Sequence, residues 1–270
     1  MARGEAAPAG FEPFTLGLRA VTVAVVVLLV APLVVIVGAS FTASAFMVFP
    51  PHGLSLRWYE QLFHQSDWLS AIEVSLLVAT CSSLLATSIG VSLGLALARF
   101  RVRAAALFQG LAVLPLLFPP VVIGVAFLTF YSHVGLTGHG FIKLTLSHAI
   151  FNAPFPFLLA YGALSKINPE IEQAAMSLGA PVPRVMRTVT LPMLSSEIFA
   201  GLALAFVLSL NDFIIAFLVS SFTITTLPIQ IFSSLRYSYS PLIAVASALF
   251  ILATFVGVWV VARLTRGVFD

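Results

Sequence analysis

The sequence alternates long apolar runs with short polar stretches, and this pattern predicts helices that cross a membrane. Six runs reach roughly the 20 residues that a helix needs to cross the hydrocarbon core of a bilayer. They are residues 20–40, 71–98, 104–130, 146–164, 198–219 and 242–262. Because these runs hold almost no charge, each backbone must satisfy its own hydrogen bonds, which favours an all-α membrane protein over a barrel of alternating strands.

The first apolar run has a second interpretation, that of a cleaved signal peptide. Ala43-Ser44-Ala45 follows it with the A-x-A form of a cleavage site. The run is longer than the roughly 7–15 residues of a signal-peptide core, so we expect a retained helix. Residues 1–19 then form an N-terminal segment, and residues 20–270 form one membrane domain.

Composition supports this class of protein. Apolar residues make up 60% of the chain and charged residues 9%, whereas soluble domains are about one quarter charged. This composition argues against a secreted domain, a cytosolic enzyme and a disordered chain. Cys81 is the single cysteine, which excludes an intrachain disulfide, and we interpret it as a small buried apolar residue. The five histidines show no ligand spacing, so neither a metal site nor a cofactor is expected.

The positive charges predict the orientation. If the N-terminus is inside, the inner segments hold ten cations and the outer segments three. The inner ones are Arg3, Arg19, Arg99, Arg101, Arg103, Lys166, Arg184, Arg187, Arg263 and Arg266, and the outer ones are Arg57, Lys143 and Arg236. Positive residues stay on the cytoplasmic side of a membrane, so both termini are expected in the cytoplasm.

A short helix is expected in the outer segment that follows the first run. Leu56, Tyr59, Leu62 and Phe63 recur at helical spacing. Trp58 and Trp68 lie beside this pattern, and amphipathic rings favour the membrane–water interface. We therefore predict a helix that lies at the outer interface.

The inner segment at residues 165–197 is too patterned for a plain connection. Asn168 and Pro169 form a helix start, and Gly179 forms a helix stop. Between them an apolar stripe is formed by Ile171, Ala174, Ala175 and Leu178. A second short helix is expected around residues 183–189, ended by Leu191-Pro192. The stripe could pack on the protein's own membrane helices or dock in a groove of a partner, and these physical arguments leave both open.

The same segment resembles a known motif. Gln173-Ala174-Ala175-x-x-x-Gly179, nine further residues and Val189-x-Leu191-Pro192 resemble the EAA motif of membrane subunits of ATP-binding-cassette importers. Gln173 stands where that family usually has Glu, and Val189 where it has Ile. Other segments resemble the spermidine/putrescine-type permeases, among them residues 55–59, 117–124, 208–213, 226–228 and 233–236.

The resemblance implies a type I importer fold, with six transmembrane helices, both termini inside and a cytoplasmic coupling helix. It implies an ATPase-coupling set of Glu172, Gln173, Ala174, Ala175, Gly179, Leu191 and Pro192. The implied partners are two copies of an ATPase subunit, a second permease chain and a periplasmic binding protein, in the bacterial inner membrane, with no nucleic acid. The implied activity is import of a small organic solute, such as putrescine or spermidine, by alternating access.

The chain is not expected to be its own motor or any other enzyme. It has two lysines, Lys143 and Lys166, and neither lies in a Gly-x-x-x-x-Gly-Lys-Ser/Thr phosphate-binding loop. No catalytic arrangement of acids, serines and histidines is readable. The alternatives are the same machine for another solute (an organophosphonate, ferric ion or an opine), an ion-coupled carrier, or a structural scaffold.

Polar residues within the apolar runs are the candidates for the substrate pathway. Asp212 lies in the run 198–219, where an acid costs on the order of 3 kcal/mol at the bilayer centre and so avoids lipid. It could line the pathway and attract a cation, or it could be a packing acid at a subunit interface. Asn211 and Asn152 are the other candidate pathway residues.

Overall fold

The computed structural model describes residues 12–136, 138–220, 223–237 and 240–265, and they are almost entirely helical. The predicted all-α class is therefore confirmed. Two of the cations used to predict orientation, Arg3 and Arg266, lie outside the described residues, as do residues 1–11 of the predicted N-terminal segment. The chain forms two compact units, residues 1–62 with 237–251 and residues 63–236 with 252–270.

The first unit contains α1 (Glu12–Ser40), most of α2 (Arg57–His64) and the start of α14 (Pro241–Thr265). The predicted short helix forms as α2, and two hydrogen bonds hold it against the chain that follows α1. The hydroxyls of Ser40 and Tyr59 lie 2.8 Å apart, and Trp58 Nε1 donates to the carbonyl of Ser44 over 3.1 Å. The side chains of Trp58 and Tyr59 thus hold α2 against the end of α1 and the residues that follow it.

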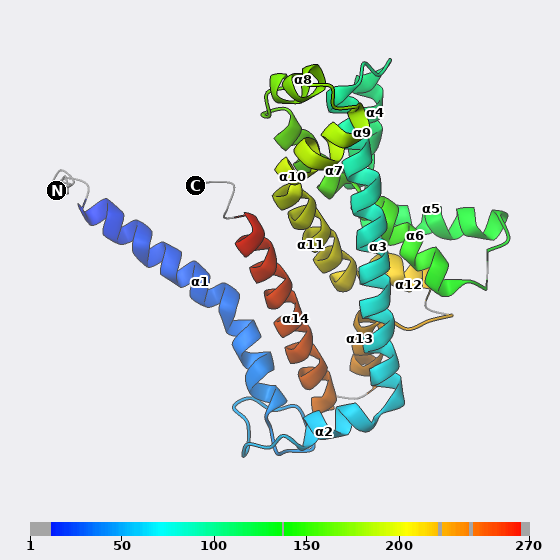
Figure 1. The fold of residues 1–270 in the computed structure, drawn as a ribbon. Helices are drawn as coiled ribbons and strands as arrows, with labels where there is room; N and C mark the ends of the chain where they lie inside the picture. Colours follow the sequence, from blue (N-terminus) through cyan, green and yellow to red (C-terminus); the bar gives the residue numbers. More distant parts are fainter. Residues whose placement is uncertain (1–11, 137, 221–222, 238–239, 266–270) are drawn as a thin grey trace. The chain divides into compact units, whose positions relative to one another are not determined.

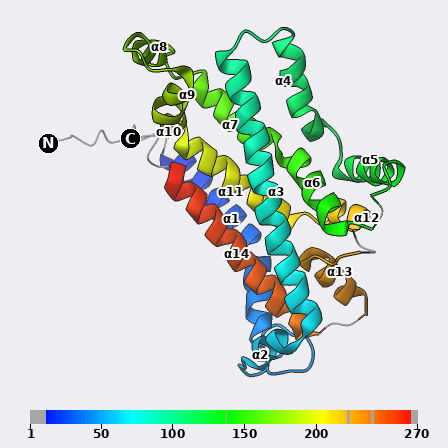
Figure 2. The same ribbon diagram turned by 45° about the vertical axis from the view of Figure 1, so that its right-hand side comes forward.

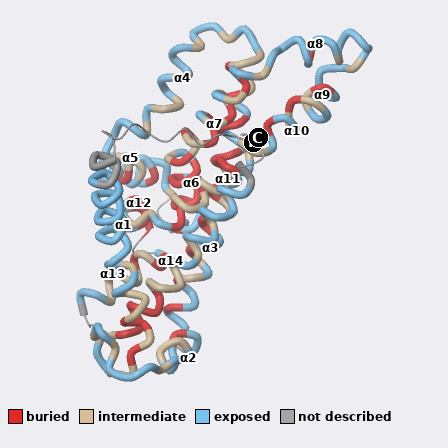
Figure 3. Tube along the Cα trace, turned by 90° about the vertical axis from the view of Figure 1, so that its left-hand side faces the viewer, coloured by how far each residue is buried: buried red, intermediate tan, exposed pale blue. Residues whose placement is uncertain are grey.

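The second unit is built on the long helix α3 (Ser66–Arg99). Along it pack α6 (Gly140–Asn152), α7 (Pro154–Leu164) and α11 (Ser195–Asn211), as Figures 1 and 2 show. The buried face of α3 consists mostly of small residues, which let helices approach closely in a membrane: Ala71, Ser75, Ala79, Ser82, Ser83, Ala86, Gly90 and Gly94. The half-buried Cys81 lies on the same helix. Figure 3 shows the buried residues concentrated where these helices meet.

The predicted span 104–130 is wrong as a single helix. It consists of α4 (Ala105–Val113), a 3₁₀ turn at Leu114–Leu117 and α5 (Pro120–His133), and its two halves are bent by 107°. Pro119 and Pro120 remove two backbone donors, and Phe118 before them takes an extended conformation, as residues before proline prefer. The prolines therefore turn α5 away from α4 (Figure 1).

The predicted span 146–164 begins earlier and is interrupted. Its helix starts at Gly140, so Lys143, expected in an outer loop, lies in α6 and is buried. The helix is interrupted at Ala153, because Pro154 and Pro156 cannot donate to the preceding turn. At this break α3 approaches so closely that a Cβ atom on Gly90 would lie 2.6 Å from the carbonyl oxygen of Ala153.

The predicted span 198–219 is also broken, at Asp212. Helix α11 ends at Asn211, Asp212 is extended (φ −73°, ψ 125°), and α12 (Ile214–Ser220) follows. The chain then forms α13 (Leu227–Tyr237), a helix that the apolar pattern did not predict. An apolar cluster of Val78, Leu144, Ala216 and Ile229 joins these elements to α3 and α6.

Within the described ranges, three helices are long and apolar enough to span a membrane: Gly17–Ser40, Ser66–Arg99 and Pro241–Val260. The number rises to at most five if each sharply bent helix pair counts as one span. The predicted total of six spans and the domain boundaries therefore stay predictions.

The patterned inner segment forms α8 (Glu170–Ser177) and then a helical stretch of α9 (Val182–Val185), a π-helical turn (Met186–Thr190) and α10 (Leu191–Met193). The second helix is longer than predicted, because the helical stretch continues through Leu191 and Pro192 and ends at Met193. This stretch leads directly into α11.

Candidate functional site: helix α8 and the polar cluster at Asp212

The two ends of α8 are set as the sequence predicts. The Oδ1 atom of Asn168 accepts the backbone N–H of Glu170 over 3.0 Å and so satisfies a free donor of the first turn. Gly179 follows the helix with φ +91°, a left-handed conformation that favours glycine. The helix therefore spans only eight residues between a side-chain cap and a glycine stop.

The predicted apolar stripe of α8 faces outward. The exposed fraction is 91% for Leu178 and 46% for Ile171. Ala174 is exposed and Ala175 half-buried, and Figure 3 shows α8 almost entirely in the exposed colour. Of the two interpretations left open by the pattern, packing on the protein's own helices is not what this geometry shows.

The remaining residues of the expected coupling set differ in where they lie. Gln173 and Gly179 are exposed, Pro192 is exposed and Leu191 is half-buried. The side chain of Gln173 also helps to line a cavity of about 190 Å³, together with Arg99, Phe100, Pro169, Met176 and Met186. These residues present a surface beside α8 that is partly apolar and partly polar.

Glu172 is the exception, because its carboxylate points inward. The Nε atom of Arg99, the last residue of α3, lies 3.0 Å from its Oε1 and 2.9 Å from its Oε2. Thr190 donates its hydroxyl to the same Oε1 over 2.9 Å. We expected Glu172 to belong to the partner-facing set, but its contacts within the chain give it a different position from Gln173.

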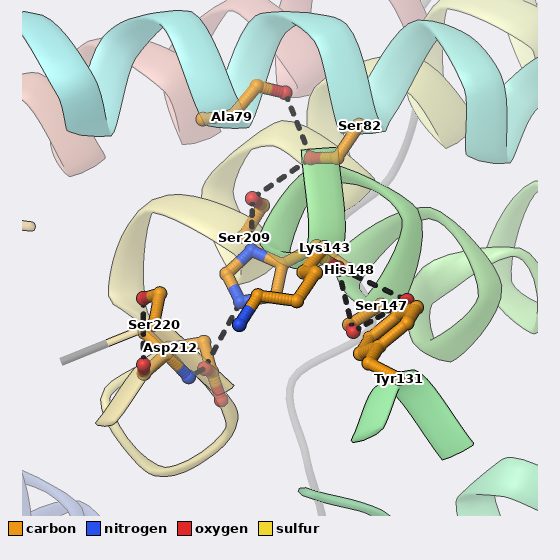
Figure 4. A network of polar contacts seen from close by, with 10 residues as sticks. Ala79, Ser82, Tyr131, Lys143, Ser147, His148, Ser209, Asp212 and Ser220 are labelled. Carbon is orange, nitrogen blue, oxygen red and sulfur yellow. Dashed lines mark hydrogen bonds and ion pairs between the residues drawn. The ribbon is translucent and has the colours of Figure 1, made fainter. Parts of the chain in front are cut away.

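A second polar cluster surrounds Asp212 (Figure 4). The Nε2 atom of His148 on α6 lies 3.1 Å from Asp212 Oδ2, and its Nδ1 lies 2.7 Å from the hydroxyl of Ser209 on α11. Ser82 on α3 donates to Ser209 over 2.9 Å. His148 is 1% exposed, so this chain of polar contacts ties three helices together inside the unit.

Asp212 also caps the helix that follows it. Its Oδ2 accepts the backbone N–H of Ala216 over 2.9 Å, which satisfies a donor in the first turn of α12. An ionised carboxylate only accepts hydrogen bonds, so Nε2 of His148 is the donor in that pair. The Oδ2 atom of Asp212 is thus bound both by the backbone N–H of Ala216 and by Nε2 of His148.

The other two candidate pathway residues lie apart from this cluster. Asn211 is exposed, and its Nδ2 donates to the carbonyl of Val207 over 2.8 Å and lies 3.4 Å from Thr254 Oγ1 on α14. Asn152 is 2% exposed at the end of α6. Within the described part of the chain, no hydrogen bond joins either asparagine to Asp212.

Sequence comparison identifies the family. The family described as "Binding-protein-dependent transport system inner membrane component" matches residues 90–270. This chain belongs to that family. The permease is 35% identical to the putrescine transport system permease protein PotI of Escherichia coli (strain K12), over 79% of the permease and 78% of PotI. It is 29% identical to the spermidine/putrescine transport system permease protein PotC of the same strain, over 82% and 84%.

The fold agrees with this assignment. The permease superposes on a chain of a bacterial ATP-binding-cassette transporter involved in the import of alginate with a TM-score of 0.73, over 99% of this chain and 100% of that chain, at 15% identity. The predicted resemblance to importer permeases and the predicted fold class are therefore confirmed. Its relatives are transport permease subunits and not enzymes, so the prediction that this chain is not an enzyme is confirmed.

Sequence reasoning missed three members of the Asp212 cluster: Ser82, His148 and Ser209. The signal was present, because His148 and Asp212 are ionisable residues inside two predicted spans, and such residues usually have a partner. The predicted span begins at residue 146, which puts His148 only two residues from its end. Helix α6 begins six residues earlier, at Gly140, so this histidine lies well inside the helix.

Proposed function

We propose that this permease forms the membrane pathway of an ATP-driven importer and that α8 is the helix that docks on the ATPase. The supporting observation is the pair of opposite faces on α8. Leu178 is 91% and Ile171 46% exposed, while Glu172 ties another face to α3. An amphipathic helix with an exposed apolar stripe suits a groove on a partner.

The proposed complex has two ATPase copies, this permease, a second similar permease and a binding protein that delivers the substrate. We place α8 and both termini in the cytoplasm. Arg99, Arg101 and Arg103 lie at the end of α3 near α8, and α13 with Arg236 lies toward the opposite end of α3 (Figures 1 and 2). Positive residues at the α8 end favour that end as the cytoplasmic one.

The proposed substrate is a polyamine such as putrescine, on the strength of PotI and PotC. For Asp212 we propose a positioning role within the chain, since its carboxylate is already held by His148 and by the backbone of α12. Asn211, which is exposed, is the stronger candidate for a residue of the pathway wall. An ion-coupled carrier is less well supported, because the exposed stripe on α8 would then have no purpose.

Docking is tested by co-purification of the tagged permease with its ATPase. Leu178→Glu is expected to abolish the association, because a charge replaces the most exposed apolar residue of α8 without disturbing its own fold. Leu54→Glu is the matched control, since Leu54 is 81% exposed but lies between α1 and α2. Equal recovery of ATPase with both variants would refute the docking assignment.

Substrate and energy source are tested with the complete complex in liposomes. We expect labelled putrescine to accumulate only with ATP and with binding protein, and unlabelled spermidine to compete. Uptake driven by a proton gradient without ATP would favour the carrier instead. Uptake of an organophosphonate with no uptake of putrescine would keep the importer and overturn the substrate.

A further inference from the structure

Arg99 joins three separate parts of the inner end of unit two. Its Nε contacts the carboxylate of Glu172 on α8, its Nη1 donates to the carbonyl of Leu164 at the end of α7 over 3.0 Å, and its Nη2 donates to the carbonyl of Ile167 over 3.4 Å. The Arg99 and Glu172 side chains are 9% and 8% exposed. A guanidinium suits this position because its planar fork presents donors in several fixed directions.

Glu172 extends the same contact toward α11. Its Oε1 accepts the hydroxyl of Thr190, which is 1% exposed and ends the π-helical turn just before α10 and α11. One carboxylate on α8 is therefore bound both by the end of α3 and by the stretch that enters α11. Those are two of the long helices that pack together in the core of the unit.

The helix that carries Glu172 depends on such contacts for its orientation. An isolated helix of eight residues is unstable in water, because nucleation outweighs the few hydrogen bonds that it gains. Its outer face, with Ile171 and Leu178, is exposed. Of the residues on α8, Glu172 is the one that is buried, so the attachment of α8 to the body of the protein depends strongly on this side chain.

We infer that the Arg99–Glu172–Thr190 cluster is the mechanical link through which movement of α8 reaches α3 and α11. Arg99 and Glu172 are then positioning residues that couple ATP hydrolysis to transport, although neither contacts ATP or substrate. This inference rests on the proposed docking of the ATPase on α8. A displacement of α8 is transmitted because Arg99 binds the carboxylate of Glu172 and the carbonyls of Leu164 and Ile167 in one fixed geometry. Without the Arg99–Glu172 pair, α8 moves independently of α3 and α11.

The experiment measures ATP hydrolysis and substrate uptake by the complete complex in liposomes. Arg99→Gln and Glu172→Gln are expected to leave assembly and basal ATP hydrolysis near the wild-type level. Uptake per ATP hydrolysed is expected to fall about tenfold, which is within the usual range of coupling between two sites. Thr190→Val, which removes one donor while keeping the shape of the side chain, is expected to give a smaller loss.

Conservative and control variants separate coupling from folding. Arg99→Lys keeps the charge but not the fork, so it should restore part of the uptake per ATP that Arg99→Gln loses. Arg101→Gln is the matched control: Arg101 is exposed, two residues further along, and its loss should leave the ratio unchanged. If Arg99→Gln fails to assemble, Arg99→Lys and Thr190→Val carry the test.

One result would overturn the inference: a normal ratio of uptake to ATP hydrolysis in the Arg99, Glu172 and Thr190 variants. This holds whether both rates stay at the wild-type level or fall by the same factor, because an equal fall means a general loss of folded complex. Failure of the proposed function has a different signature, because the wild-type complex itself would then show no ATP-dependent uptake.

Discussion

The Nε2 atom of His148 lies 3.1 Å from Oδ2 of Asp212, although 64 residues separate them in the chain. The contact joins α6 to the point where the chain leaves α11 and begins α12. An acid inside an apolar run is often interpreted as a substrate contact. Here the acid is bound by a histidine of the protein itself, and it also ends one helix and caps the next.

We predict that Asp212→Ala destabilises the permease by about 1–3 kcal/mol, because it leaves a buried imidazole donor without its acceptor and removes the cap of α12. The measurement is the temperature at which half of the detergent-solubilised protein stays monodisperse.

Asn211→Ala is the control for this prediction. Asn211 is adjacent and exposed, so its loss should change stability little. Asp212→Asn keeps an acceptor for the histidine and should be milder than Asp212→Ala. A variant Asp212→Ala that melts like the wild type would show that the His148 contact contributes nothing.

The close approach of α3 and α11 to the start of α7 predicts a second stability effect. Gly90→Ala and Gly201→Ala should each cost about 1–3 kcal/mol, because the new methyl group would meet backbone atoms, Ala153 O at 2.6 Å and Pro156 Cα at 2.8 Å. Gly110→Ala is the matched control, since no atom lies within 4 Å of its Cβ position. That change should instead stabilise α4 by about 0.5–1 kcal/mol. Equal melting temperatures for all three variants would contradict the packing argument.

The stop of α8 gives a third prediction. Gly179→Ala has free space around it but forces an L-residue to φ +91°, at a cost of about 1–2 kcal/mol. We expect weaker co-purification with the ATPase, because the end of α8 unwinds. Gly179→Asn should retain more of the association, since asparagine tolerates this conformation better. The reverse order would exclude a backbone effect.

Tyr131 holds α5 on α6, and this contact gives a fourth prediction. Tyr131 is 3% exposed. Its hydroxyl donates to the carbonyl of Lys143 over 3.1 Å and lies 3.1 Å from Ser147 Oγ. Tyr131→Phe should therefore cost about 1 kcal/mol in thermal melting. Thr129→Val removes an exposed hydroxyl that bonds only within its own helix, and it should have no comparable effect.

The apolar pattern predicted where helices occur but not where they break. Residues 104–130 and 198–219 are continuous in hydropathy, while prolines at 119 and 120 and the capping acid at 212 interrupt the backbone locally. Prolines are a common cause of kinks, but the 107° bend depends on how α5 then packs on α6 and α12. Local chemistry indicated a break, and tertiary packing set its size.

The inner helix was predictable almost residue by residue, because a cap, a stripe and a glycine stop are all local signals. The direction of Glu172 was not predictable in this way. Gln173 and Glu172 are adjacent, and only the position of Arg99, 73 residues earlier in the chain, decides which of them turns inward. The same holds for His148, whose partner is distant in sequence. Long-range polar pairs are therefore the part of the site that the sequence leaves open.

The single cysteine makes the sidedness of the membrane directly measurable. Cys81 is half-buried on α3, so Cys81→Ala followed by Leu178→Cys leaves one thiol, at the 91% exposed position that directly follows α8. A maleimide that does not cross bilayers should then label inside-out vesicles and spare intact spheroplasts. The opposite labelling pattern would place α8 outside the cell, so one reagent added from two sides reports the side of the membrane on which α8 lies.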